Sequence, residues 1–293
     1  MMTDTLTVGF VGLGNMGGPM AINVAKAGFP LVLVDADANN VNSVAQTTGG
    51  VVGTREDLAN CDVVVMMLPT SKIVATVLFG NDGEDPVRFK SGAVVVDMSS
   101  SDPKDTVLTG ERLVELGVEM VDAPVSGGIQ GATDGTLAIM LGGNDQNAID
   151  KATPVIEAMS RVIRQTGPLG SGHAAKALNN YIAATAFASL SEALAVGEEF
   201  GLEQQTLLDI VEASTGQSWN STNVAGPHIV QRQFSSGFAL PLITKDIQIA
   251  AKLADSLNLE TPVLKSVENR FSTTLDELGN VDHTLAYKQW FLN

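Results

Sequence analysis

The sequence is short of cysteine, of basic residues and of long apolar runs. Its one cysteine, Cys61, cannot form a disulfide within the chain, so the fold depends on its hydrophobic cores. Cys61 precedes an apolar run, and we expect it to be buried rather than nucleophilic. Lys and Arg number 17 against 33 Asp and Glu, a formal net charge of −16. Such a surface repels polyanions, which argues against nucleic acid and anionic membranes as partners.

The absence of long apolar runs also bears on the cellular location of the protein. No apolar stretch is long enough to span a bilayer. The N-terminal residues lack the basic start and apolar core of a signal peptide, so we expect a cytoplasmic protein. The three histidines, His173, His228 and His283, are too scattered to indicate a ligand set, and we expect no metal.

With 293 residues, the chain is long enough for two domains with cores of their own. Up to residue 167, apolar runs alternate with helical patterns. This alternation predicts an α/β domain with a doubly wound, mainly parallel sheet, and nearly continuous apolar runs predict strands covered on both faces. The predicted strands are residues 6–11, 31–35, 62–68, 93–98, 118–122, 137–141 and 162–165. Helices are predicted over 16–27 and 103–116, the second with Asp102 as its cap and Pro103 at its first position.

The pattern changes after the glycine-rich segment 167–172. Runs of β-branched residues largely stop, and Ala, Leu and Glu recur at helical spacing. We therefore predict a first domain over 1–167 and an all-helical domain over 168–293. A long helix over 173–200 is apolar on most faces, so we expect it to be buried nearly all round, between domains or subunits. Further helices are predicted over 204–213, 242–257 and 262–278.

A glycine-spaced turn follows the first predicted strand. Gly12 allows a tight turn, Gly14 lets the backbone approach a pyrophosphate, and Gly17 lets the next helix pack on the strand. The second apolar run ends in Asp35, where a carboxylate can accept hydrogen bonds from an adenosine ribose. Alternatively, the glycines only shape a turn and Asp35 caps the next helix. Because strand, turn, helix and terminal acid agree, we predict that residues 1–167 form a Rossmann domain.

The same strand end bears on the choice of cofactor. A 2′-phosphate needs cations and is repelled by a carboxylate. Asp35 is followed by Ala36 and Asp37, and the next basic residue is Arg55. The sequence therefore predicts NAD rather than NADP.

One candidate for the chemistry is a pair of polar residues in the long helix. Lys176 and Asn180 are four positions apart and share one helical face among apolar neighbours. A poorly solvated lysine has a lowered pKa and exchanges protons near neutral pH. Alternatively, Lys176 extends to solvent and Asn180 bonds to backbone.

Two other segments are candidates for substrate contacts. Ser126, Gly127 and Gly128 offer N–H and O–H donors to a carboxylate, or form an ordinary glycine-rich turn. Lys245 and Asp246 form either part of a site or an exposed ion pair at the start of a helix.

Taken together, these residues carry a family resemblance. The matching motifs lie in order along nearly the whole chain, at residues 10–21, 67–69, 97–100, 122–128, 172–180 and 245–246. The sequence resembles the β-hydroxyacid dehydrogenase family, which includes 3-hydroxyisobutyrate dehydrogenase and tartronate semialdehyde reductase. The resemblance implies an NAD-dependent oxidoreductase that transfers a hydride between NAD and a small 3-hydroxy acid.

The resemblance also implies roles for individual residues. Lys176 would be the catalytic acid/base, and Asn180 would position the substrate beside it. Ser126, Gly127, Gly128 and Lys245 would bind substrate. The cofactor-binding residues would be Gly12, Leu13, Gly14, Asn15, Met16, Gly17, Asp35, Leu68, Pro69, Ser100, Lys245 and Asp246. A homodimer or homotetramer would form through the helical domain.

The substrate remains open at this stage. The side chains at 129–130 and 133–134, which surround the carboxylate loop, and the polar cluster at 217–221 would suit a more hydroxylated substrate. The alternatives are a catalytically silent dinucleotide-binding protein, or a reductase of the same fold acting on threonate, an imine or a sugar-acid phosphate. Lys176 argues against the imine on resemblance, and the scarcity of clustered cations argues against the phosphate.

Overall fold

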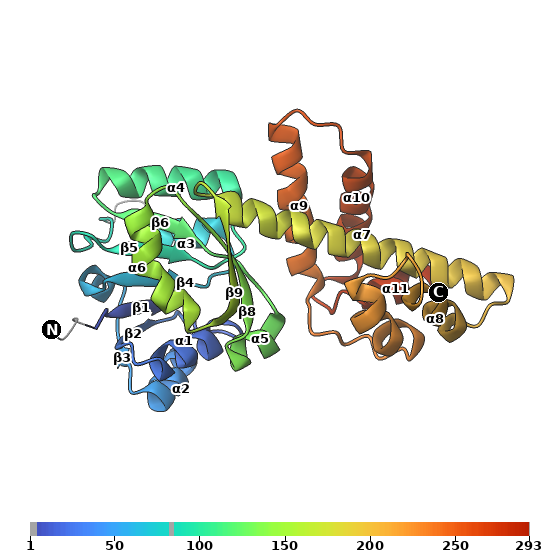
Figure 1. Cartoon of the computed structure of the whole chain (residues 1–293), viewed down its shortest axis with the longest axis horizontal. Helices are drawn as coiled ribbons and strands as arrows, with labels where there is room; N and C mark the ends of the chain where they lie inside the picture. The colour runs from blue at the N-terminus through green and yellow to red at the C-terminus, as the bar shows by residue number, and fades with distance from the viewer. Residues whose placement is uncertain (1–4, 82–84, 293) are drawn as a thin grey trace. The chain divides into compact units, whose positions relative to one another are not determined.

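The computed structural model describes residues 5–81 and 85–292. The chain divides into two compact units, residues 1–176 and 177–293 (Figure 1). Within the described residues, no helix has the length and apolar character needed to cross a membrane. Residues 1–4, the start of the N-terminal segment for which no signal peptide is expected, lie outside the described residues.

The first unit is built on one sheet, whose described strands follow the order β3-β2-β1-β4-β5-β6-β8-β7, with β9 paired to β8. The strands from β3 to β6 run parallel, β8 is antiparallel to β6 and β7, and β9 is parallel to β8. The predicted doubly wound, mainly parallel sheet is confirmed. The strands are β1 (Val8–Val11), β2 (Leu31–Val34), β3 (Val51–Val52), β4 (Val63–Met66), β5 (Val94–Asp97), β6 (Glu119–Asp122), β7 (Val125–Ser126), β8 (Leu137–Gly143) and β9 (Ser160–Gly167).

The central strands are covered on both faces, as their continuous apolar runs predict. Every residue of β1, β4 and β5 is buried. The covering elements of this unit are α1 (Gly17–Lys26), α2 (Ala38–Thr48), the 3₁₀ turn η1 (Glu56–Asn60), α3 (Ser71–Phe79), α4 (Pro103–Glu115), α5 (Gly128–Asp134) and α6 (Gln146–Glu157).

Two local predictions for this unit are also confirmed. Asp102 caps α4 by accepting a hydrogen bond from the Lys104 N–H at 3.0 Å, with Pro103 in the first turn. Cys61 is buried, and burial raises the pKa of its thiol to about 11.

The second unit is helical, as predicted. Its elements are most of α7 (Ser171–Phe200), α8 (Gln204–Glu212), the π-helical segment η2 (Ser221–Val230), α9 (Leu240–Ser256), α10 (Pro262–Leu278) and α11 (Leu285–Phe291). An aromatic cluster lies in its core, where the rings of Phe187 and Phe271 are 6.3 Å apart and those of Phe271 and Trp290 are 5.5 Å apart.

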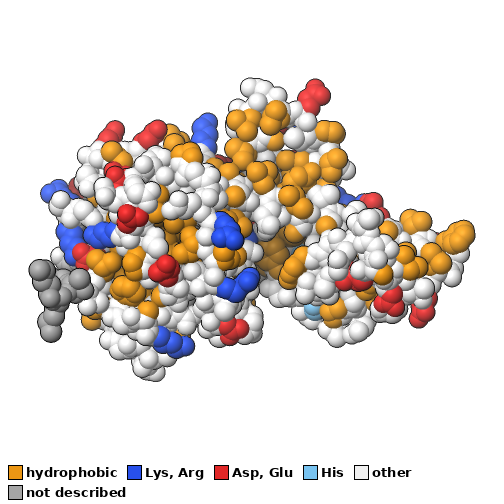
Figure 2. Space-filling model, in the orientation of Figure 1, with side chains coloured by type: hydrophobic (Ala, Val, Ile, Leu, Met, Phe, Trp, Pro, Cys, Tyr) orange, Lys and Arg blue, Asp and Glu red, His pale blue; other side chains and the backbone are white. Residues whose placement is uncertain are grey.

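Within one chain α7 is not buried all round, so the expectation that subunits cover it stays a prediction. Ile182, Val196 and Phe200 are 64%, 69% and 83% exposed. Some apolar side chains of α7 therefore lie on faces of the helix that the core of its own unit does not cover. Figure 2 shows apolar side chains at the surface of the helical unit.

Candidate active site

The turn between β1 and α1 has the geometry of a dinucleotide loop. Gly12 has a φ of +89°, and a Cβ at this position would collide with the Met67 carbonyl oxygen. A Cβ at Gly17 would collide with the Gly12 carbonyl oxygen, so α1 packs closely on the turn. A Cβ at Gly14 would meet no atom within 4 Å, so the turn opens to free space there. No side chain caps α1 at Met16, which fits a phosphate on its N-terminal N–H groups.

Asp35 is tied to this turn. Its carboxylate accepts hydrogen bonds from the N–H groups of Leu13 and Asp37. The N-cap of α2 is Asp37, which accepts from the Asn39 N–H at 2.8 Å, so Asp35 does not cap that helix. An ionised carboxylate has about four acceptor positions, which leaves Asp35 able to accept from a ribose hydroxyl.

The sheet register gathers most of the predicted cofactor residues at one edge. Val11 is the register partner of Val34 and Met66, Met66 pairs with Asp97, and Asp97 pairs with Asp122. The loops that follow these strands therefore leave the sheet side by side at their carboxyl ends. These loops carry residues 12–17, Asp35, Leu68, Pro69 and Ser100. A hydrogen bond also joins the loops after β4 and β5, since the Leu68 N–H donates to the Ser99 hydroxyl at 2.9 Å.

The predicted carboxylate loop follows β6 in the same unit. Ser126 ends β7 and pairs with Ala138 of β8. Gly127 and Gly128 have φ values of 137° and 61°, and Gly128 begins the short helix α5. A Cβ at Gly128 would meet no atom within 4 Å, so the loop is open there.

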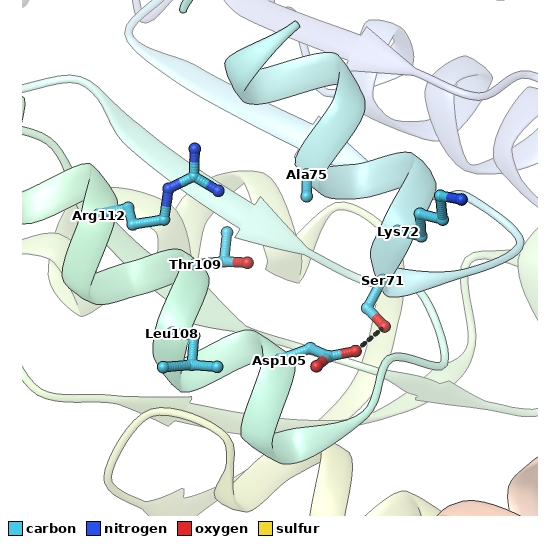
Figure 3. Close-up of a pocket in the computed structure, with 7 residues that line it drawn as sticks. All are labelled: Ser71, Lys72, Ala75, Asp105, Leu108, Thr109 and Arg112. Atoms are coloured by element: carbon cyan, nitrogen blue, oxygen red, sulfur yellow. Dashed lines mark hydrogen bonds between the residues drawn. The ribbon is translucent and has the colours of Figure 1, made fainter. Parts of the chain in front are cut away.

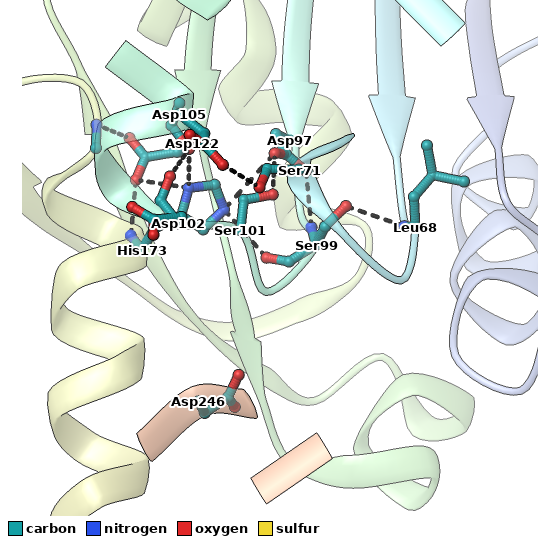
Figure 4. A network of polar contacts seen from close by, with 12 residues as sticks. Leu68, Ser71, Asp97, Ser99, Ser101, Asp102, Asp105, Asp122, His173 and Asp246 are labelled. Atoms are coloured by element: carbon teal, nitrogen blue, oxygen red, sulfur yellow. Dashed lines mark hydrogen bonds and ion pairs between the residues drawn. The ribbon is translucent and has the colours of Figure 1, made fainter. Parts of the chain in front are cut away.

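A second, buried group of polar side chains was not predicted as part of the site. Asp97 and Asp122, at the ends of neighbouring strands, lie on either side of His173 from the first turn of α7 (Figure 4). His173 Nε2 is 3.9 Å from Asp97 Oδ2, and His173 Nδ1 is 3.6 Å from Asp122 Oδ2. Burial raises the pKa of Asp122, although His173 and two backbone N–H donors favour its charged form. The sequence feature that could have indicated this group is an aspartate at the end of each of two adjacent strands.

Lys176 lies three positions after His173 in α7 and is half-buried. It is the last residue of the first unit. Asn180 follows four positions later in the same helix and belongs to the second unit.

The second unit brings three predicted residues together. Asn180 is buried, and its Nδ2 donates to Asp246 Oδ2 at 2.6 Å. Lys245 Nζ lies 3.9 Å from Asp246 Oδ1. Asp246 is 3% exposed, so the pair with Lys245 is not a fully exposed ion pair. The alternative in which Asn180 bonds only to backbone is likewise wrong.

A pocket of about 270 Å³ lies between α3 and α4 (Figure 3). The Ser71 hydroxyl donates to Asp105 Oδ2 at 2.7 Å and joins the two helices there. None of the predicted site residues lines this pocket, whose lining consists of Ser71, Lys72, Ala75, Asp105, Leu108, Thr109 and Arg112.

Two family models match the chain. The first is described as the NAD-binding domain of 6-phosphogluconate dehydrogenase and covers residues 7–167, more than half of the chain. The second is described as the NAD-binding region of NADP-dependent 3-hydroxyisobutyrate dehydrogenase and covers residues 170–290. The chain belongs to the β-hydroxyacid dehydrogenase family. The predicted family is confirmed, and with it the expected class, an NAD-dependent oxidoreductase.

Similar proteins cover nearly the whole chain. It is 35% identical to 2-(hydroxymethyl)glutarate dehydrogenase of Eubacterium barkeri, over 99% of this chain and 96% of that protein. It is 33% identical to 2-hydroxy-3-oxopropionate reductase of Escherichia coli, over 95% of each. A solved structure of Mycobacterium tuberculosis 3-hydroxyisobutyrate dehydrogenase with L-serine superposes with a TM-score of 0.87 at 28% identity, covering 98% of this chain and 99% of that one.

Proposed function

We propose that this enzyme transfers a hydride reversibly between NAD and a small 3-hydroxy acid, with Lys176 as the general acid/base. The observation that carries the proposal is the shared sheet edge of the first unit. This edge carries the dinucleotide turn and Asp35, and the loop at Ser126–Gly128 follows the same strands. Lys176 belongs to the same unit.

NAD, held by the dinucleotide turn and Asp35, would supply the hydride acceptor for oxidation of the carbinol carbon. The neutral amine of Lys176 takes the hydroxyl proton during oxidation, and the ammonium returns it during reduction. Ser126 and the N–H groups of Gly127 and Gly128 hold the substrate carboxylate. Asn180, oriented by Asp246, positions the substrate, and Lys245 adds a cation for the acid.

The cofactor residues that we propose are Gly12, Leu13, Gly14, Asn15, Met16, Gly17, Asp35, Leu68, Pro69, Ser100, Lys245 and Asp246. The Asp35 carboxylate would accept from the adenosine ribose and disfavour a 2′-phosphate, so we propose a preference for NAD over NADP.

The relatives narrow the substrate class. 2-(Hydroxymethyl)glutarate, 3-hydroxyisobutyrate and L-serine each carry a hydroxymethyl group on the carbon that bears a carboxylate. 2-Hydroxy-3-oxopropionate carries the corresponding aldehyde. A 3-hydroxypropanoate substituted at C2 is therefore the substrate class that we propose.

The domain organisation and assembly remain proposals too. We propose domains over 1–167 and 168–293, which the two family matches at 7–167 and 170–290 support. The exposed apolar residues of α7, among them Ile182, Val196 and Phe200, support a homodimer or homotetramer formed through the helical domain. A cytoplasmic location stays a prediction from the sequence.

The test is NADH formation across a panel of three- to six-carbon hydroxy acids, with wild type and Lys176→Ala side by side. We expect turnover on C2-substituted 3-hydroxypropanoates and a loss of kcat by orders of magnitude in Lys176→Ala, with NADH affinity little changed. A panel without turnover would contradict the hydroxy-acid substrate. Near-normal turnover of the variant would contradict the role of the lysine.

A further inference from the structure

The start of α7 is held by strand β6. Asp122, the last residue of β6, accepts hydrogen bonds from the N–H groups of Gly170 and His173 at 2.8 and 2.7 Å. The first turn of α7 lies close to β6 and β8, since a Cβ at Gly172 would collide with the Met140 carbonyl oxygen and crowd Asp122. The first turn of α7 therefore sits directly on the sheet.

The side chain of His173 contacts the first unit from the first turn of α7. Its side chain is fully buried, and Nε2 lies 3.1 Å from the carbonyl oxygen of Ser99. A carbonyl oxygen only accepts, so Nε2 carries the proton of this bond. Nδ1 lies 2.8 Å from the hydroxyl of Thr106 in α4. The imidazole thus joins α7 to the loop after β5 and to α4 (Figure 4).

The rotation of this turn determines where the amine of Lys176 lies. Lys176 follows His173 by three positions, which is less than one helical turn. A lysine amine extends about 8 Å from the helix axis, so a rotation of about 7° displaces it by about 1 Å. Displacements of about 1 Å at a reacting centre can lower the rate about 100-fold.

We propose that His173 is a positioning residue, whose hydrogen bonds to Ser99 and Thr106 fix the first turn of α7 and thereby the direction of the Lys176 amine. This proposal rests on the function proposed for Lys176. His173 itself does not touch the reacting atoms. Its role differs from that of Asp122, whose hydrogen bonds from Gly170 and His173 hold the backbone of the turn.

The test compares His173→Ala, His173→Gln and the control Leu113→Ala. Leu113 is a fully buried residue of α4, so its truncation lowers stability without touching the imidazole. Glutamine keeps an N–H donor for the Ser99 carbonyl and a second polar atom within the same side chain for Thr106. Measured for each are kcat and KM for the best hydroxy acid, NADH affinity by fluorescence, and Tm.

We expect His173→Ala to lower kcat about 10- to 100-fold, with NADH affinity within about twofold of wild type. His173→Gln should recover most of this loss, and Leu113→Ala should keep kcat within about threefold at a similar loss of Tm. The double variant His173→Ala/Lys176→Ala should be no slower than Lys176→Ala, because the imidazole acts through the amine.

Three results would overturn the positioning role while leaving the proposed function intact, provided that Lys176→Ala is inactive. They are normal kcat in His173→Ala, a loss confined to NADH affinity, and a Gln variant as slow as the Ala variant. Normal turnover of Lys176→Ala would instead overturn both proposals.

Discussion

Asp122, at the end of β6, accepts a hydrogen bond at 2.7 Å from the backbone N–H of His173, 51 residues later in the chain. This bond attaches the helix that carries Lys176 to the edge of the sheet where the cofactor loops emerge. The proposed cofactor loops and Lys176 therefore belong to one compact unit.

At Gly172 the packing of α7 against the sheet leaves no room for a Cβ. We expect Gly172→Ala to lower the free energy of unfolding by about 1–3 kcal/mol and to reduce kcat, because its Cβ would collide with the backbone of Met140. Thermal melting and steady-state kinetics check this. Gly226→Ala is the matched control, since its Cβ would meet only Leu208 at 3.8 Å. Equal effects of the two variants would show that β8 yields at this contact.

Asp35 is expected to set the cofactor preference. Asp35→Asn should raise the ratio of kcat/KM for NADP to that for NAD by about tenfold, because it removes a negative charge beside the ribose while keeping an acceptor for Leu13. Asp37→Asn is the control, since it removes a charge two residues away and still caps α2. An unchanged ratio in Asp35→Asn would place the discrimination elsewhere.

The bond between Asn180 and Asp246 is expected to orient the amide toward the substrate. Asp246→Asn replaces the acceptor of a 2.6 Å bond, and we expect kcat/KM for the hydroxy acid to fall at least tenfold with Tm changed little. Asp255→Asn, an exposed carboxylate in the same helix, is the control. Full activity of Asp246→Asn would indicate that Asn180 does not depend on this carboxylate.

Asp62 offers a test of pH dependence away from the site. Burial alone would raise its pKa, but hydrogen bonds from Lys90 and the Thr7 N–H, with the charges of Lys90 and Lys151, lower it overall. Because the folded-state pKa is lowered, its stabilising contribution is complete above the unfolded-state pKa of about 3.9 and disappears as the pH falls through the folded value.

Accordingly, Asp62→Asn should lower Tm by about 2–4 °C at neutral pH, and the two melting curves should converge on acidification. Differential scanning calorimetry across pH measures this. Asp150→Asn, which changes an exposed carboxylate of α6, serves as the control. A difference in Tm that persists at low pH would show that Asp62 stabilises through packing instead of charge.

Much of the fold was predictable because its long elements carry strong periodicities. The central strands were predicted within about two residues at each end, and α10 was predicted at the observed bounds, 262–278. Strands β3 and β7 have two residues each, too few to form a pattern. The short helix α5 begins in a glycine-rich stretch that resembles a turn. The π-helical segment at Ser221–Val230 contains Gly226 and Pro227, which disfavour a helix prediction.

The candidate site was also predictable only in part. Gly12, Gly17 and Asp35 were identifiable because their spacing reflects local backbone requirements. The pairing of Asp122 with His173 was not, since it depends on which strands are neighbours and on where α7 begins. Asp122 ended the predicted strand 118–122 and Asp97 lay next to the end of the predicted strand 93–98, but only the parallel register shows that the two residues are neighbours.

The burial of Cys61 has a practical consequence. Its thiol stays protonated at neutral pH and is shielded from reagents, so the wild-type chain already serves as a background for site-directed labelling. Cysteines introduced at exposed positions, such as Glu111 of α4 and Ser189 of α7, would carry the reactive thiolates. A pair of spin labels there would measure the separation of the two units in solution, with and without nucleotide.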